Sequence, residues 1–164
     1  GAFRREAFAA AGTYDETLVR NQDDELNLRL RRAGGRIVLD PRIQVFYVPR
    51  GSLRGVFRQY YEYGRWKVPV MRKHGRPLGL RSLVPALFVV TLISLLLHAT
   101  WLELAETALT ATVVLYLASA IVFGVRALRA RGETLWLLPA VVGAYLAFHI
   151  GYGVGMLRGL VRWR

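Results

Sequence analysis

Cysteine is absent from this sequence of 164 residues. The chain therefore forms no disulfide, holds no metal through a thiolate and has no cysteine nucleophile. No signal peptide precedes its polar N-terminal part, and the chain opens in what reads as a strand at Gly1, so we expect a piece of a longer protein. Acidic residues are few, 11 against 23 lysines and arginines, which leaves a formal charge of +12.

Hydrophobic residues make up 54% of the sequence, an unusual combination with that charge in one soluble domain. The charge lies mostly before Arg81, whereas residues 82–157 are nearly all apolar. Basic residues beside apolar spans are typical of proteins that meet anionic lipid headgroups. We therefore expect membrane lipids, and no nucleic acid, as partners of the basic residues.

Three uncharged runs, each 19 residues or longer, occupy residues 83–101, 107–125 and 135–157. A helix of that length crosses a hydrocarbon core of about 30 Å. The sequence thus predicts a region of three transmembrane helices over residues 82–164. Six basic residues at 65–81 put the soluble part in the cytoplasm by the positive-inside rule, while three arginines near the C-terminus leave the side of that end open.

Two helices are expected in the soluble part, at residues 4–11 and 23–33. The first consists of good helix formers that stop at Gly12. The second has Asn21 as its expected cap, three acids in its first turn and two glycines after its end.

Two short strands are expected between the second helix and residue 50. Residues 36–39 and 43–48 are rich in β-branched and aromatic side chains and flank an Asp-Pro turn. The sequence therefore predicts an α/β unit over residues 1–50.

An amphipathic, basic helix is expected at residues 52–71, within a linker region of residues 51–81. Aromatic and aliphatic residues recur at helical spacing, with Arg54, Arg58 and Arg65 between them. Such a helix suits the membrane interface, where arginine reaches phosphates and aromatic rings lie at headgroup level. Packing on the protein's own domain is the alternative.

The acidic segment at residues 21–30 has two readings. Acids stabilise the N-terminus of a helix, and Glu25 can pair with Arg29 one turn later. Asp23, however, shares a face with Leu26 and Leu30, so its carboxylate would look into a cleft at the top of the buried side.

Beyond these patterns, the segment Asn-Gln-Asp-Asp-Glu-Leu-Asn-Leu-Arg-Leu at residues 21–30 resembles the Glu-Asp motif of family 2 glycosyltransferases, with its Leu-x-Leu-Arg-Leu helix and Gly-Gly turn. Residues 1–16 resemble the strand, helix and loop before that motif. Residues 59–67 resemble the interfacial helix of the succinoglycan-biosynthesis type, which ends in three transmembrane helices, and residues 149–155 fit that subgroup as well. The resemblance covers essentially the whole chain.

Two positions depart from the family pattern. Gln22 stands where the family usually has glutamate, so one carboxylate beside the expected base is lost. Processive synthases hold the acceptor with a Gln-x-x-Arg-Trp motif, whereas here five residues separate Gln59 from Arg65.

The resemblance implies the C-terminal part of a GT-A domain and an inverting transfer of a sugar from a nucleotide sugar to a polyprenyl-linked or polysaccharide acceptor. It implies Asp23 as the general base. Residues that would contact the acceptor or its phosphates are Asp24, Gln59, Arg65, Trp66, Arg54 and Arg58.

The arginines of that set are equally explained as anchors to lipid headgroups, and Tyr60, Tyr61 and Trp66 as an interfacial aromatic belt. The family's divalent metal, Mg²⁺ or Mn²⁺, would be held by an Asp-x-Asp motif that this chain does not contain, so the chain alone is expected to be inactive.

The resemblance also implies a multi-pass protein of the bacterial inner membrane that works in exopolysaccharide or cell-envelope synthesis. A non-enzymatic membrane anchor or interaction module is the rival interpretation. In the last apolar run, we expect His149 to bond Tyr116 or Tyr152, and Gly151, Gly155 and Gly159 to let helices approach closely.

Overall fold

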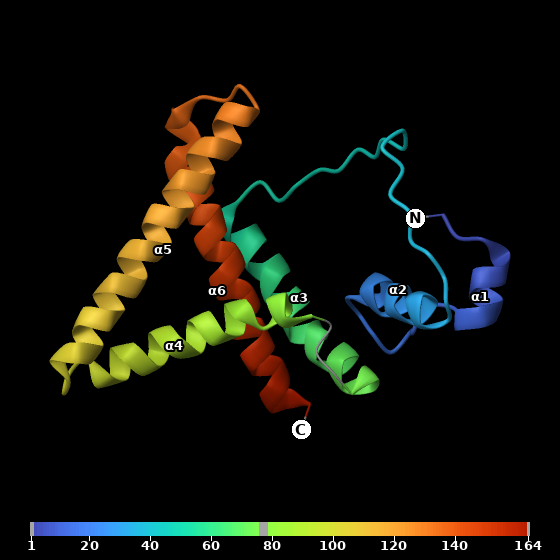
Figure 1. Ribbon diagram of the computed structural model, residues 1–164, viewed down its shortest axis with the longest axis horizontal. Coiled ribbons are helices and arrows are strands. Elements are labelled where there is room, and N and C mark those ends of the chain that lie inside the picture. The colour runs from blue at the N-terminus through green and yellow to red at the C-terminus, as the bar shows by residue number, and fades with distance from the viewer. Residues whose placement is uncertain (1, 76–78, 164) are drawn as a thin grey trace.

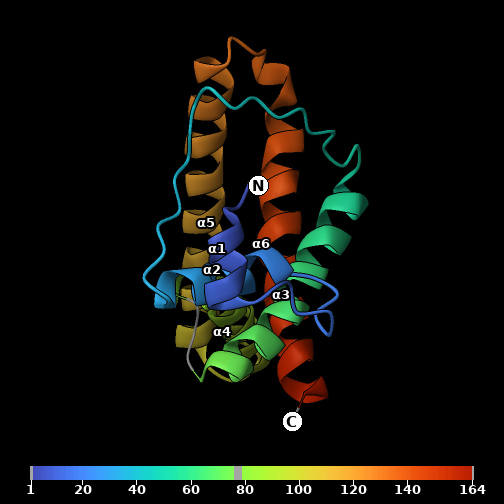
Figure 2. The same cartoon turned by 90° about the vertical axis from the view of Figure 1, so that its right-hand side faces the viewer.

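The computed structural model describes residues 2–75 and 79–163, and helices are the only regular elements in these two ranges. They are α1 (Arg5–Ala11), α2 (Gln22–Arg32), α3 (Leu53–His74), η1 (Leu80–Ser82), α4 (Val84–His98), α5 (Glu103–Ala130), η2 (Leu135–Leu137) and α6 (Leu138–Arg162). The short helices α1 and α2 lie together beside the C-terminal half of α3, and the long helices form the rest of the molecule (Figures 1 and 2).

The predicted α/β fold is wrong for the described residues. Residues 36–39 and 43–48 belong to a long extended segment between α2 and α3 that forms no strand (Figure 1). Their side chains face solvent, as Leu39 and Phe46 show with 95% and 98% of their surface exposed. A strand needs a neighbouring strand for its backbone hydrogen bonds, and β-branched residues favour strands only where such a surface exists.

The helices α1 and α2 form close to where the sequence predicts them. Gly12 ends α1, and Gly34, with a φ of 82°, follows α2. Asn21, the expected cap, has a left-handed φ of 61°, and its side chain caps nothing. Its amide instead donates a hydrogen bond of 2.9 Å to the Tyr63 carbonyl, so this residue links α2 to α3.

The amphipathic helix α3 begins at Ser52, whose hydroxyl accepts a hydrogen bond from the Gly55 amide at 3.1 Å. Such a cap satisfies one of the free amides at the helix start. The helix then runs alongside α6 in the same direction (Figure 1), and its buried residues are Gly64, Val68 and Val70. Packing on the protein's own helices thus accounts for part of its apolar face, while Leu53 and Phe57 stay exposed.

Glycines let the backbones of α3 and α6 touch. A Cβ on Gly151 would lie 2.7 Å from the Phe57 carbonyl oxygen, and a Cβ on Gly155 would overlap the carbonyl oxygen of Tyr61. On α3, a Cβ on Gly64 would overlap the carbonyl oxygen of Tyr152. The close approach expected from small residues four apart is confirmed, and the partner helix is α3.

Pro69 lies inside α3. Because proline has no N–H, the carbonyl of Arg65, four residues earlier, lacks its helical donor. That carbonyl faces α6 at Gly159, where a Cβ would lie 2.7 Å from its oxygen. The carbonyl that the proline leaves without a donor thus lies in the contact with α6.

The apolar helices match the three predicted runs, but two of them are long enough to cross a membrane. These are α5 and the combined segment Leu135–Arg162, with 28 residues each. Helix α4 has 15 residues, and at about 1.5 Å per residue it is shorter than a hydrocarbon core of about 30 Å.

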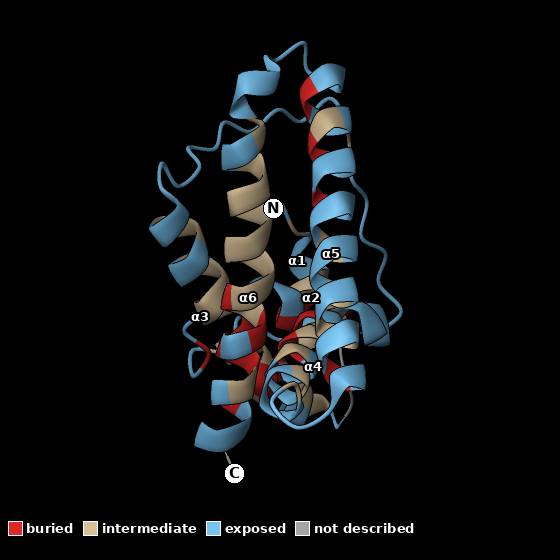
Figure 3. Ribbon diagram, turned by 90° about the vertical axis from the view of Figure 1, so that its left-hand side faces the viewer, coloured by how far each residue is buried: buried red, intermediate tan, exposed pale blue. Residues whose placement is uncertain are grey.

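The two long helices are mostly exposed, since only 11% of the most apolar stretch of each is buried within the described residues. Figure 3 shows α5 exposed along most of its length. Its exposed apolar residues include Val114, Leu115 and Phe123. Exposed apolar surface of this extent is typical of a face that meets lipid or another protein.

One of the two predicted partners of His149 is confirmed. The Tyr116 hydroxyl lies 2.9 Å from His149 Nδ1 and joins α5 to α6. Nearby, Val68, Ala86 and Met156 form a small buried core between α3, α4 and α6.

Candidate functional site

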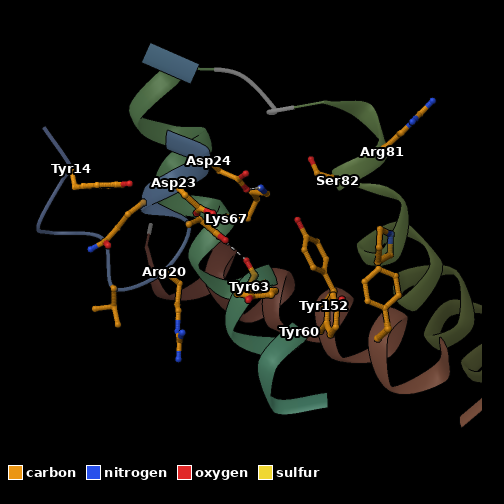
Figure 4. Close-up of a pocket in the computed structure, with 15 residues that line it drawn as sticks. Tyr14, Arg20, Asp23, Asp24, Tyr60, Tyr63, Lys67, Arg81, Ser82 and Tyr152 are labelled. Atoms are coloured by element: carbon orange, nitrogen blue, oxygen red, sulfur yellow. Dashed lines mark hydrogen bonds and ion pairs between the residues drawn. The ribbon is translucent and has the colours of Figure 1, made fainter. Parts of the chain in front are cut away.

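A pocket of about 850 Å³ lies between α2 on one side and the helices α3, α4 and α6 on the other. Figure 4 shows Asp23 and Asp24 of α2 facing Tyr60 and Tyr63 of α3 across it. Its remaining walls come from the loop before α2 and from η1. The lining residues are Tyr14, Val19, Arg20, Asn21, Gln22, Asp23, Asp24, Tyr60, Tyr63, Lys67, Arg81, Ser82, Pro85, Phe148 and Tyr152.

The two aspartates differ in what holds them. Asp24 forms an ion pair with Lys67 of α3. For Asp23, no hydrogen bond or ion pair is found within residues 2–75 and 79–163, and the residue is exposed at the pocket. Neither carboxylate oxygen of Asp23 is bonded to a described residue. Asp23 rather than Asp24 can therefore accept a hydrogen bond from an incoming hydroxyl through either oxygen.

Cations and aromatic rings complete the pocket. Arg20 and Arg81 line it from the loop before α2 and from η1. An aromatic wall is formed by Tyr152 of α6, by Phe148 one turn earlier on that helix, and by Tyr60. The ring centres of Tyr60 and Phe148 lie 4.2 Å apart. The pocket thus combines carboxylates, guanidinium groups and ring faces, which suit a hydroxyl, a phosphate and a sugar respectively.

The structure does not bring the other predicted acceptor residues to this pocket. The Gln59 amide donates to the hydroxyls of Tyr47 and Tyr63, at 3.3 and 3.1 Å. Arg65 lies 3.6 Å from Glu62 and stacks near Trp66 and Trp163.

Trp66 itself packs on Trp163 of α6, with ring centres 5.0 Å apart. Arg54 and Arg58 are exposed on α3 and lie outside the pocket lining. Contacts of these residues with an acceptor or with lipid phosphates remain predictions.

Beneath the pocket, Glu25 is buried completely, with no exposed surface. Its carboxylate accepts hydrogen bonds from Arg29 Nε at 2.9 Å and from His74 Nε2 at 3.0 Å, and it forms an ion pair with Lys73 Nζ at 2.9 Å. The expected pair with Arg29 is thus confirmed. Lys73 also reaches Asp15, at 2.5 Å. This group joins α2 and the loop before it to the end of α3.

The pKa values in this group follow from those bonds. Burial raises the pKa of Glu25, but hydrogen bonds from Arg29, Lys73 and His74 outweigh it and leave the pKa below its usual value. Hydrogen bonds from Lys73 and Thr17 hold the pKa of Asp15 well below its usual range. Burial lowers the pKa of Lys73, but its bonds to Asp15 and Glu25 prevail and raise it.

We expect acid to loosen the contact between α2 and α3. Carboxylates with lowered pKa values stabilise the folded state above their usual pKa of about 4, and this contribution is lost as the pH falls through the lowered values. Hydrogen exchange of the α2 amides, corrected for intrinsic rates, should be slow at pH 7 and faster below about pH 4. The α6 amides are the control, and unchanged protection of α2 in acid would contradict the prediction.

Arg20, Lys67, Arg81 and Tyr152 are among the pocket residues that were not predicted as site residues from the sequence. Three of them come from segments more than 35 residues away from Asp23, so only the fold brings them there. The position of Arg81, as the last basic residue before the first apolar run, was the one signal available.

Comparison with known proteins finds a relative along nearly the whole chain. Over 162 residues, or 98% of its length, the chain is 32% identical to the succinoglycan biosynthesis protein ExoA of Rhizobium meliloti (strain 1021). The chain spans about half of that protein, 47% of its length. No family model and no solved structure matches the chain.

The comparison supports the resemblance seen in the sequence at the level of succinoglycan biosynthesis. The assignment to glycosyltransferase family 2 remains a prediction.

Proposed function

We propose that this chain is part of an inverting glycosyltransferase of exopolysaccharide or cell-envelope synthesis, which transfers a sugar from a nucleotide sugar to a lipid-linked acceptor. The observation that carries the proposal is the position of Asp23, an available carboxylate in a pocket whose opposite wall is built from the apolar helices. Similarity to a succinoglycan biosynthesis protein supports it.

In this proposal Asp23 is the general base. An acceptor hydroxyl in the pocket loses its proton to the Asp23 carboxylate as its oxygen attacks the anomeric carbon of the donor sugar. The bond from that carbon to the nucleotide diphosphate breaks, and the configuration at the carbon inverts. A positioned base contributes about 10²–10⁴-fold to such a step.

The lipid-linked acceptor is the proposed occupant of the pocket because its parts match the walls. A diphosphate suits Arg20 and Arg81, since guanidinium groups bind phosphate oxygens in pairs. A sugar suits the faces of Tyr60 and Tyr152. Lipid reaches this site along α4 and α6, which place the pocket at the membrane surface on the cytoplasmic side in our proposal.

The metal of the family does not fit the residues of this chain. Within residues 2–75 and 79–163 there is no group of three His, Cys, Asp or Glu side chains that would hold a metal ion, and Asp24 is paired with Lys67. We therefore assign no step to a metal here and propose Mg²⁺ or Mn²⁺ ligands in residues outside this chain.

The test of the proposed function is transfer of labelled sugar by the full-length protein in membrane vesicles. A panel of nucleotide sugars is supplied, and label in the extracted lipid is measured. Incorporation that depends on the protein and on one donor supports the transferase. The rival, a non-enzymatic membrane anchor, predicts no incorporation with any donor.

Arg81→Ala tests the acceptor site. If Arg81 binds acceptor phosphate before and during the reaction alike, its loss should raise the KM for lipid acceptor about tenfold and change kcat little. Arg129→Ala, which removes an exposed arginine of α5 outside the pocket, is the matched control. A normal KM in Arg81→Ala would remove this residue from the acceptor site.

A further inference from the structure

The orientation of α2 depends on polar contacts with α3. The segment that joins the two helices, residues 33–52, is extended and almost entirely exposed, so it constrains α2 weakly (Figure 1). Two sets of polar contacts join α2 to α3, and residues later in α2 contact residues later in α3. At the start, Asn21 bonds the Tyr63 carbonyl and Asp24 pairs with Lys67. Further along, α2 meets the last residues of α3.

Glu25 lies at the centre of this second set of contacts. One carboxylate oxygen is 2.9 Å from Lys73 Nζ and 3.0 Å from His74 Nε2. The other is 2.7 Å from Arg29, whose guanidinium also donates to the carbonyls of Ala11 and Thr13. The carboxylate thus ties the loop before α2, α2 itself and α3 together.

His74 adds a second link to α2. Arg32 Nη1 lies 2.6 Å from His74 Nδ1. A guanidinium is only a donor, so Nδ1 accepts this bond and the ring proton sits on Nε2, from which it is donated to Glu25. The histidine is therefore held from both sides by α2.

A fully buried carboxylate with three nitrogen partners is costly to form, because charged groups lose their hydration on burial. Apolar residues of similar size would hold two helices together as well. The charged hydrogen bonds differ from apolar packing because they fix the orientation of α2 relative to α3. Each bond has a preferred geometry and weakens when one helix rotates or slides.

We infer that Glu25, together with Lys73 and His74, forms a positioning cluster that fixes α2, and with it Asp23, against α3 and the pocket wall. The role in catalysis rests on the proposed function, whereas the docking of α2 on α3 does not. Glu25 lies two residues after Asp23 on the same helix, so a rotation of α2 moves the Asp23 carboxylate out of line with the pocket.

The experiment uses the full-length protein in membranes and the variant Glu25→Gln, which keeps the side-chain volume and removes the charge. Glu6→Gln, the same change at an exposed position of α1, is the matched control. Spin labels on Arg31 of α2 and Arg72 of α3, both exposed, report the distance between the helices. Sugar transfer is measured in parallel on the protein without labels.

We expect Glu25→Gln to broaden the distance distribution and to lower kcat at least about tenfold with little change in the KM for the donor, since a misplaced base costs up to about 10²-fold. Lys73→Met should do the same, and the double variant should be no worse than either single one. Lys73→Arg, which keeps a cation, should have a distance distribution and a kcat much closer to those of the wild type than Lys73→Met has. Glu6→Gln should resemble the wild type.

A narrow, unchanged distance in Glu25→Gln would overturn the positioning cluster, whatever the activity. A broadened distance with full transfer would overturn its role in the reaction. If the wild-type protein transfers no sugar while Glu25→Gln still broadens the distance, the proposed function fails and the docking of α2 by Glu25 stands.

Discussion

Asp23→Asn is expected to lower sugar transfer by about two orders of magnitude or more. The change keeps the shape of the side chain and a carbonyl oxygen at the same place, but an amide does not accept the proton of the attacking hydroxyl. Because Asp23 is exposed and forms no bond to the described residues, folding and membrane insertion should be unaffected. The loss should therefore appear in kcat with donor binding intact.

The measurement compares initial rates of label transfer into lipid for wild type and variants at equal amounts of membrane-inserted protein. Asp40→Asn is the matched control, since among the described residues the Asp40 carboxylate bonds only its near neighbour Arg42, and it lies outside the pocket. Asp24→Asn should have an intermediate effect because it breaks the pair with Lys67. Full activity in Asp23→Asn would remove this residue as the base.

Gly155→Leu is expected to separate α3 from α6 and to destabilise the protein more than any other single change along this contact. A Cβ at Gly155 overlaps the Tyr61 carbonyl oxygen, so the obstacle is backbone and no side chain can rotate away from it. Overpacking costs about 1–3 kcal/mol even where side chains yield, and the expected cost here is larger. The amount of folded protein in the membrane should fall sharply.

Gly143→Leu, on the same helix, gives the comparison. A Cβ at Gly143 meets only the flexible end of Leu53, at 3.0 Å, so this variant should be much less affected. Thermal unfolding in mild detergent, followed by the loss of monodisperse protein, measures both. Equal midpoints for the two variants would show that the close contact at Gly155 is not what holds the helices together.

The sequence predicted the helices well because their signals are local. Gly12 and the two glycines after α2 mark helix ends, and the glycines of α6 recur every four residues, so they lie on one face whatever surrounds them. The bond from His149 to Tyr116 followed from the cost of a polar group in an apolar span.

The predicted strands failed for the opposite reason. Val38 and Val45 favour a strand only when a second strand pairs with their backbone, and that partner is a property of the fold. The links from Glu25 to Lys73 and His74 were missed because they join residues almost 50 positions apart. Only the pairing of Glu25 with Arg29, one turn away, was visible in the sequence.

Pro69 has a consequence for how the two long helices recognise each other. The Arg65 carbonyl that it leaves without a helical donor faces Gly159, where an added Cβ would lie 2.7 Å from its oxygen. A larger residue at 159 would block that approach, and an N–H at 69 would turn the carbonyl back into its own helix. Proline in α3 and glycine in α6 therefore complement each other, and they fit only when the Arg65 carbonyl lies opposite Gly159. The pair thus favours one alignment of α3 along α6.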